Sequence, residues 1–477
     1  MFFALFGINS IGAAATKKVA WLYYPKSSHD SWQKERMSVT RVRLGGLLLL
    51  LLSAGIFVGW GSVMERTAVG GMGDFKGVYY GTRCLLGHCD PYSVSELESF
   101  YRANGWKIPT ESLPRRQGAT LYVNMPTSFF FIAPFAMQPW GSAHVLWMIV
   151  TAGSLILAGF LMWNLGSSYA PNVSLFLICI LLANCEIVYA SGNTAGIVVG
   201  LCVVGAWCFL KGRFVPVGVL CMAASLAIKP HDAGLVWLFF LLAGGVYRKR
   251  ALQTAAVTAV LGLVAVVWVS HVAPRWMPEQ RANLVTITNP GSINDPGPAN
   301  VHGTDPNTVI GLQTILSVFR NDSRIYNPVT YFVCGALLLL WSARTLRSRF
   351  SPESAWIALA AVVPLTMLVT YHRPYDAKLL LLTVPACAIL WAEGGLVGWI
   401  ALLASTAGMV LTGDIPLVIL FILTENLHIG TAGIFGQMVT VVLMRSVSLI
   451  LLMLTIFYLW VYIRRTRDKM IPDLSHE

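Results

Sequence analysis

The chain has 477 residues, of which 56% are hydrophobic and only 12% are charged. An ordinary water-soluble domain has roughly 25% charged residues, so this composition excludes a soluble globular protein. The formal net charge is +12. The Lys and Arg residues are nevertheless scattered between apolar segments, which argues against a nucleic-acid-binding domain with one basic face. The composition therefore predicts a membrane protein with no nucleic-acid partner.

The first 36 residues differ from the rest of the chain. They contain an apolar stretch and several lysines, and they end just before Met37, which opens the sequence MSVTRVRLGGLLLLLL. A few basic residues followed by a first span is a typical start for an inner-membrane protein. We expect either that Met37 is the initiator or that residues 1–36 are a loosely ordered cytoplasmic tail, and we assign residues 1–43 to the cytoplasm.

Apolar runs of about 20 residues are long enough to cross the hydrocarbon core as helices. The clearest runs are 44–63, 252–273, 354–371 and 439–463. Less continuous runs add spans at 141–163, 172–190, 193–210, 214–230, 233–247, 326–343, 377–395 and 396–412. The sequence thus predicts an all-α polytopic membrane protein of about 12 transmembrane helices over residues 44–463.

Clusters of Arg and Lys orient these spans, because cytoplasmic loops are enriched in positive charge. The clusters lie at 41–43, 211–213, 248–250, 344–349 and 464–469. About 12 spans place all of them inside, together with both termini and a C-terminal tail at 464–477. This topology fits a bacterial inner-membrane protein with two larger extracytoplasmic loops.

The first outer loop is residues 65–140 and the second is residues 274–325. Within the first, 127–137 (TSFFFIAPFAM) is apolar but too short to span, so we expect a helix at the membrane interface. The second is rich in Pro, Gly, Asn and Asp, a composition that favours turns over a packed core. A further outer excursion is expected at 413–438.

With the basic clusters inside, the remaining polar residues at span ends fall on the outer side. They are Asp74, Asn193, Lys229, His231, Asp232, His372, Arg373 and Asp376. Charged groups near membrane depth are costly, so their gathering predicts a functional site. Simpler roles stay open: Lys229 snorkelling to headgroups, Asn193 or Asp376 capping a helix, Asp376 pairing with Arg373, and Asp74 as a solvated loop carboxylate.

The nine cysteines contain no CxxC pair and no zinc-ligand spacing. Seven lie in apolar segments, where a small buried hydrophobic side chain is the expected role. Cys84 and Cys89 instead flank a short turn in the first outer loop. The sequence leaves open whether they form a disulfide or remain two free thiols.

Six short motifs occur in a characteristic order. They are GDFKGVYY with Asp74, Tyr79 and Tyr80, GHCDPY at 87–92, LYVNMPTSFFFIAPF at 121–135, SGN at 191–193, AIKPHD at 227–232 and YHRPYD at 371–376. In order and spacing they resemble the GT-C class of polyprenyl-phosphate-sugar-dependent glycosyltransferases, and most of all glycosyltransferase family 87, over residues 44–400. The chain departs from that pattern at Met125 and Pro126, where relatives often show two prolines, and at His231 after the Lys-Pro element.

This resemblance implies an inverting transfer of a hexose, mannose by the family's pattern, from a polyprenyl-phosphate sugar to an envelope lipid or glycan. An acceptor hydroxyl needs a general base, and Asp74 is the candidate, with His372 orienting the acceptor or Asp74. The developing charge of the leaving phosphate needs cations or aimed donors, for which Lys229, Arg373 and His231 are the candidates. The predicted substrate-binding residues are Tyr79, Tyr80, Asn124, Asn193 and Asp376.

No GxGxxG follows a strand and no P-loop is present, which suits a donor carried by a lipid rather than by a nucleotide. The sequence also lacks an Asp-x-Asp motif, so we predict no metal and no cofactor. A transporter would show inverted repeats and ionisable residues at mid-membrane, and neither is evident. A lipid-linked polymer ligase, which would depend on Arg and His in the late loop rather than on Asp74, is the other alternative.

Overall fold

The structure is a computed structural model that describes residues 29–67, 71–105, 113–297, 309–416, 419, 422 and 433–468. The chain divides into two units, Met1–Leu49 and Leu50–Glu477. Of the first unit, the structure describes only the start of helix α1 (His29–Thr67). Predictions for residues 1–28 and for most of 413–438 lie outside the described residues. All helices from α2 onward belong to the second unit.

Helices make up nearly all of the described chain, and seven of them are long and apolar enough to cross a membrane. These candidate spans are Leu44–Thr67, Trp140–Gly166 (α6), Pro171–Ser191, Gly245–Val272 (α12), Ser323–Arg347 (α15), Pro352–Val369 (α16) and Ser446–Arg465. Shorter apolar helices are Ala195–Lys211 (α9), Val215–Ile228 (α10), Pro230–Leu242 (α11), Gly395–Leu411 (α18) and Gly433–Met444 (α20). The prediction of an all-α polytopic membrane protein is confirmed; the number of spans stays a prediction.

The candidate spans differ in how much of their surface is buried inside the protein. Helix α16 is 78% buried over its most apolar window, whereas α12 is 11% buried. An all-round apolar helix belongs either inside a bundle or in lipid. Helix α16 is therefore a central helix, while the exposed Leu263 and Val267 of α12 suit contact with lipid.

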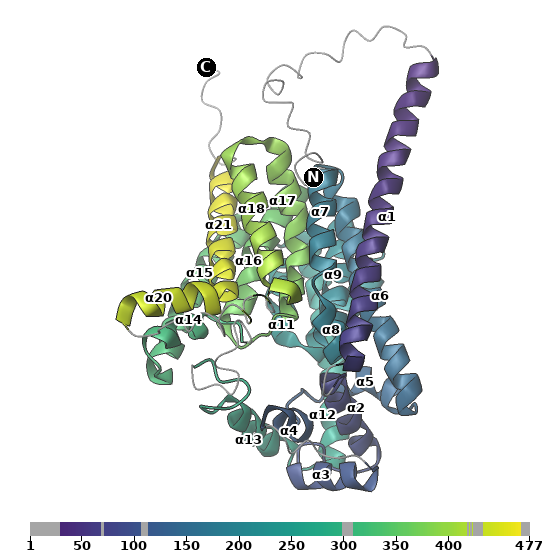
Figure 1. The fold of residues 1–477 in the computed structure, drawn as a ribbon, viewed down its shortest axis with the longest axis vertical. Helices are drawn as coiled ribbons and strands as arrows, with labels where there is room; N and C mark the ends of the chain where they lie inside the picture. Colours follow the sequence, from purple (N-terminus) through teal and green to yellow (C-terminus); the bar gives the residue numbers. More distant parts are fainter. Residues whose placement is uncertain are drawn as a thin grey trace. The chain divides into compact units, whose positions relative to one another are not determined.

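Two predicted spans are interrupted. The expected span 439–463 breaks at Arg445, between α20 and α21 (Ser446–Asp468), and Figure 1 shows α20 lying across the direction of α21. Arg445 is buried, and a charged side chain in an apolar run makes a straight, lipid-facing continuation unfavourable. The span at 172–190 likewise breaks into α7 (Pro171–Leu182) and α8 (Glu186–Ser191).

Short helices gather beyond one end of the long ones (Figure 1). They are α2 (Gly73–Leu86), α3 (Val94–Ala103), α4 (Leu113–Thr120), α5 (Ser128–Ala136) and α13 (Trp276–Thr288). Aromatic side chains form their shared core, which includes Phe75, Tyr92, Tyr122, Phe129 and Trp147. A helix is present where the apolar stretch 127–137 was expected to form one, and its Phe129 and Ile132 are buried in this core.

The second outer loop is more ordered than its composition suggested. It contains α13 and α14 (Leu312–Phe319), and residues 298–308 between them lie outside the described residues. The amide of Asn283 on α13 donates to the backbone oxygens of Tyr92 at 2.9 Å and Tyr122 at 3.1 Å. Such buried side-chain to backbone hydrogen bonds satisfy irregular backbone, so the two outer loops hold each other in place.

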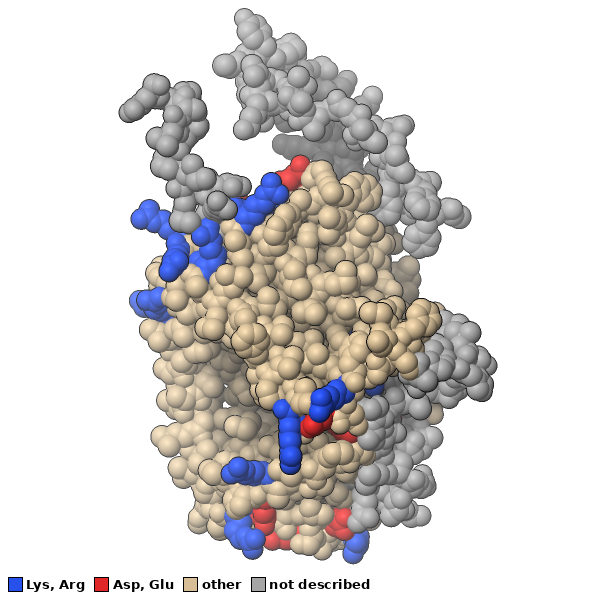
Figure 2. All heavy atoms as spheres, turned by 90° about the vertical axis from the view of Figure 1, so that its left-hand side faces the viewer, with Lys and Arg blue, Asp and Glu red and all other residues tan. Residues whose placement is uncertain are grey.

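Charged side chains mark the two ends of the described surface. Figure 2 shows Lys and Arg side chains concentrated near one end, a broad band with almost no charge, and charges of both signs toward the other end. The last turn of α15 carries Arg344 and Arg347. A wide uncharged band between charged ends is the pattern expected of a surface that meets a bilayer.

Candidate functional site

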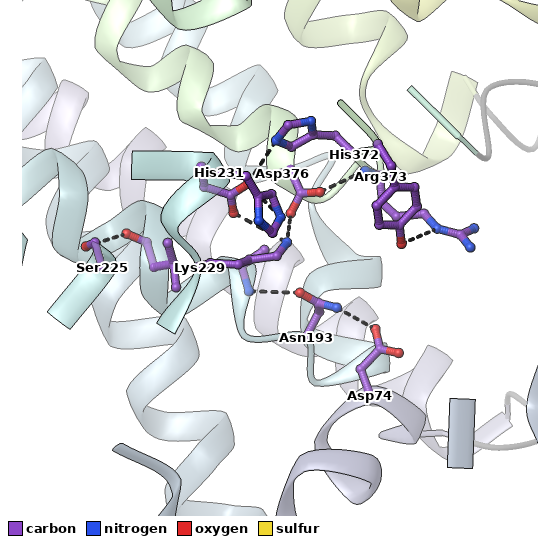
Figure 3. A network of polar contacts seen from close by, with 12 residues as sticks. Asp74, Asn193, Ser225, Lys229, His231, His372, Arg373 and Asp376 are labelled. Atoms are coloured by element: carbon purple, nitrogen blue, oxygen red, sulfur yellow. Dashed lines mark hydrogen bonds and ion pairs between the residues drawn. The ribbon is translucent and has the colours of Figure 1, made fainter. Parts of the chain in front are cut away.

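The predicted polar residues come from four separate segments. Asp74 lies in the first turn of α2, and Asn193 lies between α8 and α9. Lys229 separates α10 from α11, and His372 and Arg373 precede the 3-10 helix η3 (Asp376–Thr383). Figure 3 shows these residues in one polar network.

Asn193 connects Asp74 to the start of α9. Its Nδ2 donates to Asp74 Oδ2 at 2.8 Å, while its Oδ1 accepts from the backbone N–H of Ala195 at 2.9 Å. Asn193 thus satisfies one of the free N–H groups at the start of α9 and holds the Asp74 side chain. The Asp74 carboxylate itself is exposed.

The turn before Asn193 fixes where α2 packs. Gly192 has φ +66°, and a Cβ there would lie 2.7 Å from the Cβ of Phe75. Its backbone oxygen accepts from the indole N–H of Trp147 at 2.9 Å. Glycine is required here by both its conformation and its closeness to α2, and the packing sets the position of Asp74.

Lys229 lies at a break between two apolar helices. It precedes Pro230 and has φ −146° and ψ 78°, as expected because a following proline disfavours helical backbone. Its ammonium forms a close ion pair with Asp376 and lies 3.4 Å from Asp232, and the three side chains are at most 14% exposed. Burial lowers the pKa of Lys229, but the two carboxylates outweigh burial and raise it above its ordinary value. Lys229 therefore stays charged.

His372 is fully buried between two oxygen atoms. Its Nδ1 lies 2.9 Å from the backbone oxygen of Thr370, and its Nε2 lies 3.2 Å from Asp232 Oδ1. Burial lowers the pKa of His372, but the hydrogen bond and charge of Asp232 raise it above the ordinary 6.5. Two oxygen neighbours suit an imidazolium with both nitrogens protonated. The backbone of His372 also pairs with Ile310, with hydrogen bonds of 2.8 and 3.1 Å.

Arg373 reaches from this segment to the second outer loop. Its guanidinium donates to the backbone oxygen of Ile293 at 2.8 Å, to Asn294 Oδ1 at 3.2 Å and to the Tyr371 hydroxyl at 3.1 Å. Burial lowers the pKa of Arg373, but the nearby Tyr371, Tyr375 and Asp74 raise it. Asp74 and Arg373 therefore lie within electrostatic reach of each other.

Other predicted residues lie elsewhere. Tyr79 and Tyr80 are buried in the aromatic core of the outer helices and contact each other and Trp140. The Tyr79 hydroxyl donates to Gln138 O at 2.7 Å. Both rings take part in this packing, and their assignment to substrate binding stays a prediction. Large aromatic rings gain most by packing in the core.

Asn124 and the two loop cysteines have structural contacts in the first outer loop. The backbone oxygen of Asn124 accepts from the Tyr92 hydroxyl at 2.8 Å and from Gln280 Nε2 at 3.0 Å. Its side chain is half-buried. Cys84 and Cys89 form a disulfide, which closes the turn after α2.

Asp232 is the residue that the sequence interpretation undervalued. It was placed on the outer side but given no role, yet its carboxylate lies within 3.7 Å of Lys229, His231 and His372. The KPHD spacing was the available signal, since it places Asp232 three residues from Lys229, within one helical turn. His231, Asp232 and His372 also have ligand atoms within 4.8 Å of one another. The ammonium of Lys229 beside Asp232 disfavours a metal cation there.

Residues 122–304 match the family model of glycosyltransferase family 87. This segment includes Asn193, Lys229, His231 and Asp232, and the match is consistent with a GT-C class glycosyltransferase. It confirms the resemblance and supports a membrane glycosyltransferase enzyme. The matched segment is shorter than the predicted 44–400, and Asp74 and the 371–376 motif lie outside it. No curated protein and no solved structure matches the chain.

Proposed function

We propose that the protein transfers a hexose from a polyprenyl-phosphate donor to a hydroxyl of an envelope lipid or glycan, with inversion, at the outer face of a bacterial inner membrane. The proposed sugar is mannose, by resemblance to the family. The observation that supports the proposal most is the exposed carboxylate of Asp74, held by Asn193 within electrostatic reach of Arg373.

Asp74 is the proposed general base. Asp232 and Asp376 are each 1% exposed and paired with Lys229, so an acceptor hydroxyl reaches them less easily than it reaches Asp74. In the proposed step, the acceptor oxygen attacks the anomeric carbon while its proton passes to the Asp74 carboxylate. The bond from that carbon to the phosphate oxygen breaks, and the lipid phosphate leaves with the electron pair.

The leaving phosphate needs positive charge or aimed donors. His231 is 36% exposed and Arg373 is half-buried, so we assign the phosphate contacts to these two side chains. Lys229 was predicted to make such a contact as well, but its ammonium is occupied by two carboxylates. We propose that Lys229 instead holds Asp376 in place and acts on the phosphate only through its charge.

Asp376 and His372 would position the site rather than contact the substrate. Asp376 Oδ2 accepts from the backbone N–H of Arg373 at 2.8 Å, while its Oδ1 pairs with Lys229. His372 is tied to Asp232 at 3.2 Å. This arrangement orients the segment that carries Arg373 toward the helix junction with Lys229, which supports preorganised binding of a charged donor.

The test uses purified protein in nanodiscs with radiolabelled polyprenyl-phosphate mannose and a membrane lipid extract. We expect transfer of label to the extract, an inverted anomeric configuration in the product by NMR, and no transfer from the matching nucleotide sugar. Transfer from the nucleotide sugar, or none from the lipid donor, contradicts the proposal. Mass spectrometry of envelope glycans and glycolipids from a deletion strain then identifies the sugar and the acceptor.

A further inference from the structure

Four buried oxygen atoms gather where the α7–α8 helix breaks. They are Asn184 Oδ1, both carboxylate oxygens of Glu186, and Asp414 Oδ1, and no described residue outside this cluster donates a hydrogen bond to any of them. Glu186 is 0% exposed and Asp414 is 5% exposed. Buried acceptors without donors are rare and costly, so this cluster needs a positively charged or proton-donating occupant.

Several contacts bring these oxygen atoms together. The backbone N–H of Ile187 donates to Asp414 Oδ2 at 2.6 Å, and the charges of Glu186 and Asp414 act on each other. A Cβ on Gly413 would lie 2.5 Å from the Cβ of Asn184, so the chain next to Asp414 lies directly on Asn184. The Asn184 amide nitrogen donates to Ile180 O at 2.9 Å, which leaves its oxygen as the unused group.

Lys378 lies beside the cluster without neutralising it. Its buried ammonium donates to the backbone oxygens of Asn184 at 2.7 Å and Thr412 at 2.8 Å, just past the ends of α7 and α18. The structure gives it no ion pair with Glu186 or Asp414. When both acids are ionised, the two carboxylates and one ammonium leave one excess negative charge in a buried region.

We propose that Asn184, Glu186 and Asp414 bind a sodium ion. The ligand set is oxygen only, as hard cations prefer, and a monovalent ion balances the single excess charge where a divalent ion would overcompensate. One shared proton would satisfy at most two of the four acceptors, whereas a cation can contact all four. Broken spanning helices commonly supply oxygen ligands and helix C-terminal ends to Na+.

The sodium ion would stabilise two segments that carry the polar network. Helix α8, which begins at Glu186, leads directly to Asn193. The 3-10 helix η3 begins with Asp376 and includes Lys378. The Lys378 ammonium donates to the backbone oxygen of Asn184 at the same helix break. A cation at this break would therefore hold both segments without belonging to the candidate site.

The test compares full-length protein in nanodiscs in sodium chloride and in N-methylglucamine chloride at equal ionic strength. We expect a saturable rise in Tm with Na+ alone, and saturable binding of radioactive sodium to the wild-type protein. Asn184→Ala, which keeps both carboxylates, should weaken the apparent Na+ affinity about tenfold or more. Glu186→Gln should abolish the shift, and Glu98→Gln on α3, which is ion-paired with Arg102 and lies outside the cluster, is the matched control that retains it.

Absence of sodium binding to the wild-type protein overturns the proposal, whether or not the variants fold. An equal Tm rise in both salts does the same, because it reports ionic strength. Stabilisation that follows pH but not Na+ would assign a shared proton to Glu186 and Asp414 instead, and a sodium shift that persists in both Glu186→Gln and Asp414→Asn would place the ion elsewhere.

Discussion

Replacing Asp74 by asparagine separates its chemistry from its place in the structure. The carboxylate accepts a hydrogen bond of 2.8 Å from Asn193 Nδ2, and the oxygen of a substituting amide can accept the same bond. Asn193 is itself fixed by the backbone of Ala195 at 2.9 Å. The variant therefore keeps the local geometry and loses the proton acceptor.

General-base catalysis contributes about 10² to 10⁴-fold to a rate, which corresponds to about 2.7 to 5.4 kcal/mol in the activation free energy at ~1.36 kcal/mol per factor of ten. We expect Asp74→Asn to lower kcat by that factor. Because Asp74 is exposed and its hydrogen bond is retained, KM should change little. Loss of a carboxylate from the first turn of α2 costs only about 0.3 to 1 kcal/mol in stability.

The assay is steady-state transfer from radiolabelled polyprenyl-phosphate mannose in nanodiscs, with Tm measured on the same samples. Asp322→Asn is the matched control, because Asp322 caps α15 through Arg324 N at 2.9 Å and asparagine caps a helix equally well. It should retain full turnover. Wild-type kcat in Asp74→Asn refutes the general-base role, and an effect confined to KM reassigns Asp74 to substrate binding.

Three further outcomes are expected from the geometry. Lys229→Met should cost about 3 to 5 kcal/mol of stability, because it leaves Asp232 and Asp376 buried without their cation; Lys229→Arg, which keeps the charge, should lose less in a Tm comparison. The pKa of His372 is raised in the folded protein, so its imidazolium contributes its full stabilisation below the ordinary pKa of 6.5 and loses it as pH rises through the raised value. The Tm measured at increasing pH should therefore fall on the alkaline side, and it should fall less in Asp232→Asn. Reduction of the Cys84–Cys89 disulfide, which closes a short loop, should cost about 2 kcal/mol. It is seen as a lower Tm in Cys84→Ser and Cys89→Ser but not in Cys221→Ser, a half-buried free cysteine.

Helix positions were predictable because apolar length and flanking charge are local properties. Helices α9, α10 and α12 begin and end within seven residues of the predicted spans. The break at Arg445 was not predicted, because one charge within a long apolar run does not reveal whether the helix turns or continues. The order in α13 was missed for a related reason: Asn283 and Gln280 obtain their partners from the other outer loop, 156 to 191 residues away in sequence.

The sequence was sufficient to infer that the polar residues gather on one side, but not to infer which role each of them has. Alternation of spans predicted that Asp74, Lys229 and Asp376 share one side, and the structure connects the last two directly. Sequence alone does not indicate which carboxylates are buried. Since a buried carboxylate requires a cation, Asp232 and Asp376 both engage Lys229, and a phosphate would compete with both carboxylates for its ammonium. The same requirement makes the exposed Asp74, which has an amide partner instead of a cation, the carboxylate best placed to accept a proton.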